Sequence, residues 1–248
     1  MTLNHVTAAP TRPGLGSLLV GIIDRPGSSL RSVADRAGVS TWLVPLVILI
    51  VCYVPAVVVQ APYNVELAQQ QAARQLEQMP TEQQRQAATQ IETFTSATFL
   101  IATGVGTGVI TLLVGLAAQS LVLYLGSLVT GGEVTYGLLF RISVWSRLPY
   151  ALSYLALAAF TMVAGRPVHY PGLAALVASG NVMQDSAQPL VALLGSIDLF
   201  WLWHLALVAS GVSAARRARN GASVGLTLVY AVLSLIAQSI PAVLFAVG

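Results

Sequence analysis

The chain has 248 residues, of which 56% are hydrophobic and only 8% charged, and its formal net charge is +3. So few polar groups cannot cover a soluble globule of this size, which excludes a soluble protein and predicts an integral membrane protein. The basic balance reflects membrane topology, as shown below, so we expect no nucleic-acid binding. The single cysteine, Cys52, excludes an internal disulfide and a thiolate metal site.

Residues 1–40 are expected to form a cytoplasmic amino-terminal segment. Apolar residues recur at helical spacing, which predicts a short amphipathic helix lying in the membrane interface; they are Leu15, Leu18, Leu19, Ile22 and Ile23. The apolar run is too short to span, and no small-residue cleavage pattern follows it, so we expect no removable signal peptide. Arg31 and Arg36 follow towards the lipid headgroups, where a general positively charged anchor is favoured over a specific lipid site.

Residues 41–248 contain five apolar stretches. Each is long enough, or nearly so, to cross about 30 Å of hydrocarbon at about 1.5 Å per helical residue. They cover residues 41–60, 98–125, 148–165, 189–212 and 223–245. The predicted fold class is therefore all-α, a polytopic membrane helix bundle with five transmembrane helices.

The distribution of arginine predicts the orientation. All twelve basic residues are arginine, and a cytoplasmic amino terminus places nine of them inside and three outside. The inside arginines are Arg12, Arg25, Arg31, Arg36, Arg141, Arg147, Arg216, Arg217 and Arg219, and the outside ones are Arg74, Arg85 and Arg166. The opposite orientation would invert this bias. We therefore predict that the amino terminus is inside and the carboxyl terminus outside.

Residues 62–96, between the first two spans, are rich in glutamine, glutamate and alanine, and should form an extracytoplasmic helical extension. Thr81 and Gln84 form a capping-box pattern just after Pro80. One helix should therefore end near Met79, and the next should start there and feed the second span. A hydrated extension is favoured over a docking surface for an extracytoplasmic partner.

The second span carries small residues at steps of four, three and four along one helix face. This helix-packing stripe consists of Gly104, Gly108, Thr111 and Gly115. Small side chains let another helix backbone approach closely. Such close packing is important in lipid because the hydrophobic effect does not drive helices to associate there. The glycines at the start of the stripe are preceded by no strand and followed by no lysine, so they do not form a nucleotide-binding loop.

Asp198 is the one carboxylate in a predicted span, about ten residues into the fourth. An ionised group at that depth costs on the order of several kcal/mol unless it is paired, so it should face protein or water, or be protonated. A structural ion pair or a backbone-capping hydrogen bond is favoured over a transport or proton site. Candidate partners are Arg147, at the cytoplasmic start of the third span, and the amides of Gln119 and Gln238.

No catalytic or metal-binding constellation is expected. His204 lies six residues after Asp198, about 120° around the helix, so the two side chains do not converge. His5 and His169 lie in other segments, which excludes a metal cluster, and we expect no cofactor. Ser196 and His204 lie about 12 Å apart along one helix axis, too far for a Ser-His-Asp triad. We therefore expect that the protein is not an enzyme.

Five short motifs occur in a characteristic order and spacing around the spans. They are IIDRPGSSLRSVAD at residues 22–35, WLVP at 42–45, LVTGG at 128–132, WSRLP at 145–149 and IDLFWLWH at 197–204. In this order they resemble the bacterial branch of the Yip (Ypt-interacting protein) domain family, over nearly the whole chain from about residue 15 onwards.

This resemblance implies a five-span, amino-terminus-in membrane protein without known enzymatic activity, in which residues 41–248 form the Yip-type membrane domain. Eukaryotic relatives interact with Rab-type GTPases and shape traffic between secretory compartments, whereas some bacterial relatives look like accessory factors of export transporters. The chain lacks the Asp-Leu-Tyr-Gly-Pro element and the long acidic amino-terminal tail of many eukaryotic members. That departure argues against GTPase binding.

The leading hypothesis is a non-enzymatic membrane scaffold or accessory subunit. Its partners would be membrane lipids and other integral membrane proteins, such as an export transporter or a second copy of the chain. Arginine without lysine indicates a GC-rich genome and hence a bacterial plasma membrane. The alternative is a small transporter or channel that uses the intramembrane polar residues around Asp198. That alternative requires Asp198, His204, Gln119 and Gln238 to converge on a water-lined path.

Accessibility labelling of single cysteines introduced at Gln84 and Arg217 tests the predicted topology. The arginine bias predicts that the two positions are labelled from opposite sides of the membrane. Labelling of both positions from the same side would overturn the five-span orientation.

Overall fold

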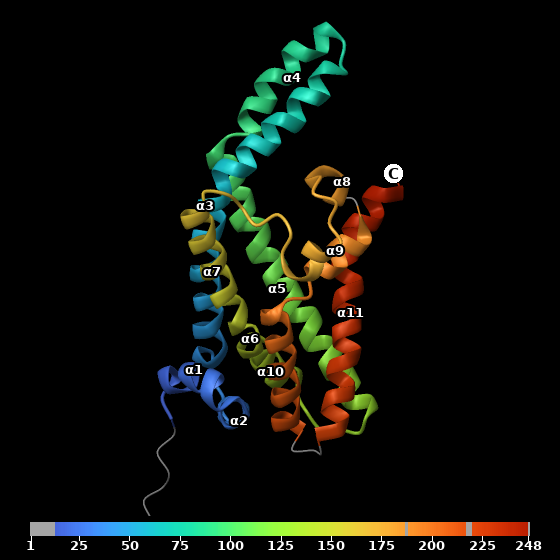
Figure 1. The fold of residues 1–248 in the computed structure, drawn as a ribbon. Coiled ribbons are helices and arrows are strands. Elements are labelled where there is room, and N and C mark those ends of the chain that lie inside the picture. The colour runs from blue at the N-terminus through green and yellow to red at the C-terminus, as the bar shows by residue number, and fades with distance from the viewer. Residues whose placement is uncertain (1–12, 187, 217–219, 248) are drawn as a thin grey trace, which may run out of the picture.

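The structure is a computed structural model that describes residues 13–186, 188–216 and 220–247, and this described part contains helices and no strand. The elements are α1 (Leu15–Asp24), α2 (Pro26–Ala34), α3 (Ser40–Glu77), α4 (Thr81–Phe94), α5 (Ala97–Val129), α6 (Tyr136–Ser146), α7 (Leu148–Ala164), η1 (Gly172–Leu176), α8 (Val182–Ser186), α9 (Pro189–Gly195), α10 (Leu199–Arg216) and α11 (Asn220–Val247). Figure 1 shows the long helices side by side, with α1 and α2 at one end of the bundle and an arm containing α4 at the other.

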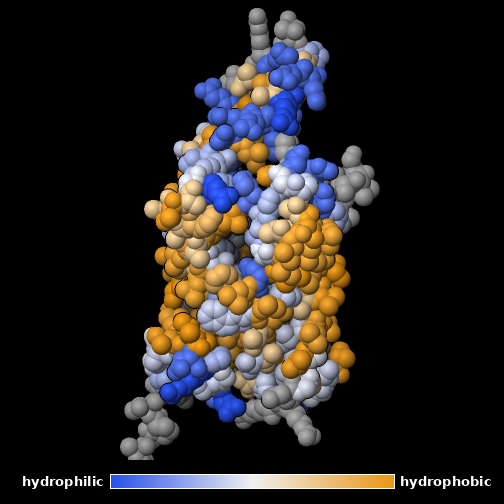
Figure 2. All heavy atoms as spheres, in the orientation of Figure 1, coloured by the Kyte–Doolittle hydropathy of each residue, from blue (hydrophilic) through white to orange (hydrophobic). Residues whose placement is uncertain are grey.

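Five helical segments are long and apolar enough to cross a membrane. They are Ser40–Glu77, Ala97–Val129, Tyr136–Ala164, Leu199–Arg216 and Gly221–Ile240. In Figure 2 hydrophobic atoms dominate the side of the bundle, while hydrophilic atoms gather on the arm and at the opposite end. The predicted all-α bundle of five membrane-capable helices is confirmed, and the orientation of its termini stays a prediction.

The first span and the extension that follows it form one continuous helix. α3 has 38 residues, a length of about 57 Å at 1.5 Å per residue, which exceeds the thickness of a bilayer core. Its outer part and α4 form the arm in Figure 1. α4 ends at Phe94, and Ser96 begins a new helix, because its hydroxyl accepts the N–H of Phe99 at 3.3 Å. The second span is therefore a separate helix, although the sequence predicted that the extension would feed into it.

The predicted capping box at the start of α4 is wrong. Pro80 is the N-cap residue of α4, so Thr81 is already inside the helix. Gln84 instead donates from Nε2 to the carbonyl oxygens of Leu76 at 3.0 Å and Met79 at 2.9 Å. Carbonyls at a helix C-terminus have no partner within the helix. Gln84 therefore satisfies the end of α3 and closes the turn between the two helices of the arm.

The third candidate span covers Tyr136–Ala164, and is longer than the predicted 148–165 because α6 and α7 share it. Pro149 lies in the first turn of α7, as predicted, where a missing N–H breaks no helical hydrogen bond. Arg147 lies at the joint between the two helices rather than at the cytoplasmic start of the span, and Arg141 lies within α6. If Arg141 and Arg147 are left out of the count, seven arginines remain on the predicted inner side and three on the predicted outer side. The distribution of arginine therefore still predicts a cytoplasmic amino terminus.

The fourth span is not the single helix predicted over residues 189–212, because the chain breaks between α9 and α10. Asp198 acts as an N-cap of α10, where its Oδ1 accepts the N–H of Trp201 at 2.7 Å. The carbonyl oxygen of Ile197 accepts the N–H of Leu173 at 3.1 Å, so η1 satisfies a backbone group that the break releases. Asp198 therefore lies at a helix terminus and not ten residues inside a helix.

The helices α1 and α2 pack against the bundle. Their buried apolar residues form a cluster with α6 and α10: Leu18, Ile22, Leu30, Val33, Trp145 and Leu207. The indole N–H of Trp145 donates to the carbonyl of Thr41 at 2.6 Å and ties α6 to the start of α3. The predicted amphipathic helix is present as α1, but much of its apolar face contacts protein, and Val20 and Ile23 are left exposed.

The first glycines of the small-residue stripe on α5 face α3. A Cβ added to Gly104 would lie 3.1 Å from Val57, and one added to Gly108 would overlap the Tyr53 ring. The Tyr53 hydroxyl donates to the carbonyl of Gly104 at 3.1 Å. The stripe therefore does allow a close approach between two helices, as its spacing predicts.

The rest of the stripe behaves differently. Gly115 faces Arg147, whose Nη2 lies 3.3 Å from the position of an added Cβ, whereas Thr111 is exposed. Two glycines outside the stripe also mark close helix contacts. A Cβ on Gly126 would overlap Leu226 of α11, and one on Gly211 would overlap Ile142 of α6.

Replacement of Gly108 by leucine should destabilise the protein, because the new side chain would displace the Tyr53 ring and separate α5 from α3. Overpacking of this kind costs roughly 1 to 3 kcal/mol. Gly106→Leu is the matched control on the same helix, since nothing lies within 4 Å of its added Cβ. Thermal unfolding in detergent should show a lower midpoint for Gly108→Leu alone. Equal midpoints for the two variants would contradict the packing.

Candidate functional site

A network of polar side chains lies at the centre of the bundle and joins α5, α6, α7, α10 and α11. Its members are Gln119 of α5, Ser146 at the end of α6, Arg147 at the joint with α7, His204 of α10 and Tyr230 of α11. All are buried except Arg147, which is half-buried. Buried polar groups are costly unless they are hydrogen-bonded, so their pairing determines what this site can do.

Gln119 is the hub of the network, and its neighbours fix the orientation of its amide. Arg147 carries only donors, and its Nε lies 3.2 Å from Oε1 of Gln119, so the amide oxygen faces the arginine. The amide Nε2 then donates to the Ser146 hydroxyl oxygen at 3.2 Å. The Ser146 hydroxyl in turn donates to the carbonyl of Ser143 at 2.9 Å. In this part of the network each donor thus points away from the Arg147 guanidinium and towards the backbone of α6.

His204 and Tyr230 close the network from the other side. His204 Nδ1 lies 2.8 Å from the carbonyl oxygen of Ser146, which can only accept, so Nδ1 carries the hydrogen. Its Nε2 lies 3.2 Å from the hydroxyl of Tyr230, and that hydroxyl lies 3.2 Å from Oε1 of Gln119. Since tyrosine has one hydroxyl hydrogen, Tyr230 donates either to a neutral His204 or to Gln119.

Arg147 places a positive charge inside a candidate membrane span. In the described residues no carboxylate lies within ion-pair distance of it. Its guanidinium carbon lies 5.9 Å from the centroid of the Tyr150 ring, whose face attracts a cation. Gly115 leaves room for the guanidinium on α5, so glycine at this stripe position accommodates a charged side chain.

The structure brings together only some of the polar residues that the sequence singled out. Gln119, Arg147 and His204 belong to one network, but Gln238 is exposed and donates to the carbonyl of Ser234 on its own helix at 3.0 Å. Asp198 is half-buried and holds the N-terminus of α10. No ion pair joins it to Arg147 within the described ranges. The backbone-capping interpretation of Asp198 is confirmed, and the ion-pair interpretation is wrong.

Sequence reasoning missed Ser146, Tyr150 and Tyr230. Each is a common residue in an apolar stretch, and its importance comes from side chains on other helices that no local spacing reveals. The motif WSRLP at 145–149 does contain Ser146 and Arg147, so the order of motifs was the one available signal.

A buried carboxylate, Asp185, lies in α8, in the segment that connects α7 to α9, and sequence reasoning did not single it out. It accepts the N–H of Ser179 at 3.0 Å, the hydroxyl of Ser179 at 2.8 Å and the N–H of Gly180 at 3.1 Å. The Tyr170 hydroxyl, followed by these donors, holds the pKa of Asp185 below its ordinary value. The stabilisation is therefore present above the ordinary carboxyl pKa and is lost as the pH falls through the lowered one. Asp185 therefore holds this segment in place through hydrogen bonds from Ser179 and Gly180.

The network holds helices together through hydrogen bonds between their side chains and backbone. Ser146 donates to a backbone carbonyl, and His204 uses Nδ1 on a backbone carbonyl, so neither forms a nucleophile and base pair with the other through side chains. In the described part of the chain no group of three or more His, Cys, Asp or Glu side chains is placed to hold a metal ion.

Comparison with known families agrees with the arrangement of spans. A family model described as the Yip1 domain matches residues 20–240. No curated protein and no solved structure matches the chain. The matched segment contains all five candidate spans in whole or nearly so, and every member of the polar network.

Tyr230→Phe removes the hydroxyl that links His204 to Gln119 and should destabilise the bundle by about 1 to 3 kcal/mol, the usual cost of leaving a buried polar partner unpaired. Tyr136→Phe is the control, since its exposed hydroxyl makes one bond, to the Ala117 carbonyl at 3.3 Å. We expect unfolding measurements in detergent to separate the two variants clearly. A Tyr230→Phe protein as stable as Tyr136→Phe would show that the network contributes little.

Proposed function

The chain belongs to the Yip1 domain family, and on this premise we propose that it is a non-enzymatic membrane scaffold or accessory subunit. It would associate with other integral membrane proteins, such as an export transporter. The observation that carries this proposal is that Gln119, Arg147, Ser146 and His204 are hydrogen-bonded to one another within the helix bundle. Polar groups used in this way serve to fix helix positions.

A transport site makes a different demand on intramembrane polar residues. Groups on a solute or proton path must exchange partners with water or with the solute. Asp198, around which a transport hypothesis would be built, is engaged with the N–H of Trp201 at 2.7 Å. Gln238 bonds its own helix and stands apart from the network. These positions favour the scaffold over the transporter.

The surfaces of the molecule also suit a scaffold. Large apolar side chains are exposed on the spans, among them Ile110 and Val114 of α5 and Leu228 and Val232 of α11. They offer contact area to lipid or to the helices of a partner. The arm projects beyond the bundle, where Figure 2 shows a hydrophilic surface. We place the protein in a bacterial plasma membrane, because the chain has arginine and no lysine.

Reconstitution in proteoliposomes tests the proposal against transport. We expect no proton or ion flux above that of empty liposomes, and no difference between the wild type and Asp198→Asn, because asparagine is an equally good N-cap. A wild-type flux that disappears in Asp198→Asn or Arg147→Gln would favour the transporter.

Extraction from native membranes in polymer nanodiscs, followed by cross-linking and mass spectrometry, tests the accessory role itself. The expected result is a further integral membrane protein at a fixed stoichiometry. Recovery of the chain as an isolated monomer would contradict an accessory role.

A further inference from the structure

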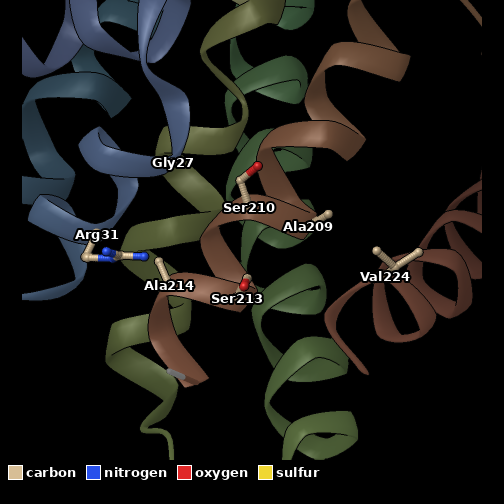
Figure 3. A pocket seen from close by; sticks show the side chains of 7 residues that line it. All are labelled: Gly27, Arg31, Ala209, Ser210, Ser213, Ala214 and Val224. Carbon is tan, nitrogen blue, oxygen red and sulfur yellow. The ribbon is translucent and has the colours of Figure 1, made fainter. Parts of the chain in front are cut away.

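A pocket of about 340 Å³ opens at the end of the bundle that carries α1 and α2, between α2, α10 and α11. It is lined by Gly27, Arg31, Ala209, Ser210, Ser213, Ala214 and Val224. Figure 3 shows the Arg31 guanidinium pointing from α2 towards Ala214, with Ser210 and Ser213 on α10 and Val224 on α11. The pocket thus combines one cation, two hydroxyls and small apolar side chains.

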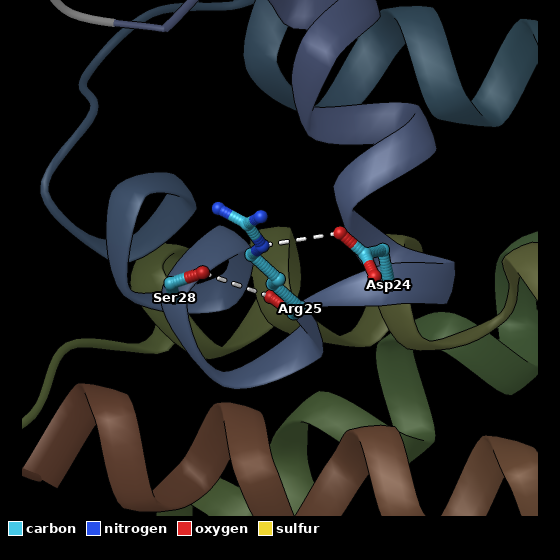
Figure 4. Close-up of polar contacts among 3 residues, drawn as sticks. All are labelled: Asp24, Arg25 and Ser28. Carbon is cyan, nitrogen blue, oxygen red and sulfur yellow. Dashed lines mark hydrogen bonds and ion pairs between the residues drawn. The ribbon is translucent and has the colours of Figure 1, made fainter.

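Arg31 differs from its neighbour Arg25 in how its charge is balanced. Arg25 forms an ion pair with Asp24 at 3.1 Å, and both side chains are largely exposed (Figure 4). Within the described ranges no carboxylate lies within 4.0 Å of the Arg31 side chain. Asp35, one turn further along, lines a separate pocket together with Arg216. Among the described residues that line the pocket, Arg31 is therefore the one ionisable side chain, and its charge favours an anionic ligand.

The position of the pocket specifies the kind of anion. α10 and α11 are candidate spans, and the pocket lies along the last turns of α10 and the first turns of α11. Val224 and Leu228 of α11 are 47% and 60% exposed, and they continue the apolar surface away from the pocket. A ligand held here would have its charged group beside Arg31 and an apolar part along α11. Phospholipids have this form, and basic pockets between helices at a membrane surface bind their headgroups.

We propose that this pocket binds the phosphate of an anionic phospholipid, with Arg31 as the charged contact and the Ser210 and Ser213 hydroxyls as further polar contacts. Ser210 now donates to the Ala206 carbonyl at 2.8 Å, and rotation of the hydroxyl redirects that hydrogen to a phosphate oxygen. Gly27 also lines the pocket, and nothing lies within 4 Å of its added Cβ, so this position has room for a larger side chain. A bound lipid would fix α2 against α10 and α11.

Native mass spectrometry of the full-length protein in detergent, with added phosphatidylglycerol, tests the site. Arg31→Gln removes the charge and Gly27→Leu adds a large side chain to the pocket lining without changing charge, while Arg25→Gln makes the same charge change outside the pocket. Phosphatidylcholine and inorganic phosphate serve as alternative ligands. A lipid-facing arginine contributes about 1 kcal/mol, which corresponds to about a fivefold change in affinity. We expect Arg31→Gln and Gly27→Leu each to weaken the first bound phosphatidylglycerol by about this factor or more, and Arg25→Gln to leave it unchanged.

Several results would overturn the proposal. Equal weakening by Arg25→Gln would show a diffuse surface charge, and unchanged binding in Arg31→Gln would show that the lipid sits elsewhere. Equal affinity for phosphatidylcholine would contradict an anionic site. Displacement of the lipid by inorganic phosphate at comparable concentration would identify a free phosphate as the ligand. Thermal midpoints of the variants show whether each is folded, and the site is independent of the proposed scaffold role.

Discussion

The need to pair polar groups inside a membrane bundle governs this structure. Gln119 meets that need for three neighbours, because its amide oxygen faces Arg147 and the Tyr230 hydroxyl and its amide nitrogen donates to Ser146. Hydrocarbon offers no water to replace any of these bonds, so the helices that carry them are constrained to meet at one point. His204 adds α10 to the same point through its contacts with Ser146 and Tyr230. The network therefore fixes how α5, α6, α10 and α11 meet, whereas α3 packs against α5 and α7 outside it.

The interruptions in the helices follow from the same requirement. The chain breaks between α6 and α7 at Arg147, whose guanidinium lies beside Gln119 and Gly115 of α5. The second break, before α10, exposes backbone groups that Asp198 and the N–H of Leu173 satisfy. Irregular backbone at membrane depth is tolerated only where protein groups or water pair it. Family membership and the hydrogen bonds of the network together support a structural role for Gln119, Ser146 and His204.

The sequence predicts the helical content, the five spans and the close approach at Gly104 and Gly108, because each depends on local composition or on spacing along one helix. Hydropathy cannot show that Arg147 lies at a joint, or that the fourth span breaks before Asp198. These features depend on acceptors that other helices supply. The role of Tyr230 cannot be predicted from the sequence for the same reason. A single tyrosine in an apolar stretch is typical of a membrane interface, and only the fold places Gln119 and His204 beside it. Conversely, the sequence singled out Gln238 as a candidate partner of Asp198, but its side chain hydrogen-bonds to the Ser234 carbonyl of its own helix.

A double-mutant cycle between Gln119 and Tyr230 tests the central claim most directly. The free energy of unfolding in mixed micelles would be measured for the wild type, Gln119→Met, Tyr230→Phe and the double variant. If the two side chains act in one network, the losses are not additive, and the coupling energy falls in the range of about 0.5 to 3 kcal/mol found for residues that share a hydrogen-bond network. Additive losses, within about 0.3 kcal/mol, would show that the two residues act independently, and would contradict a core organised around Gln119.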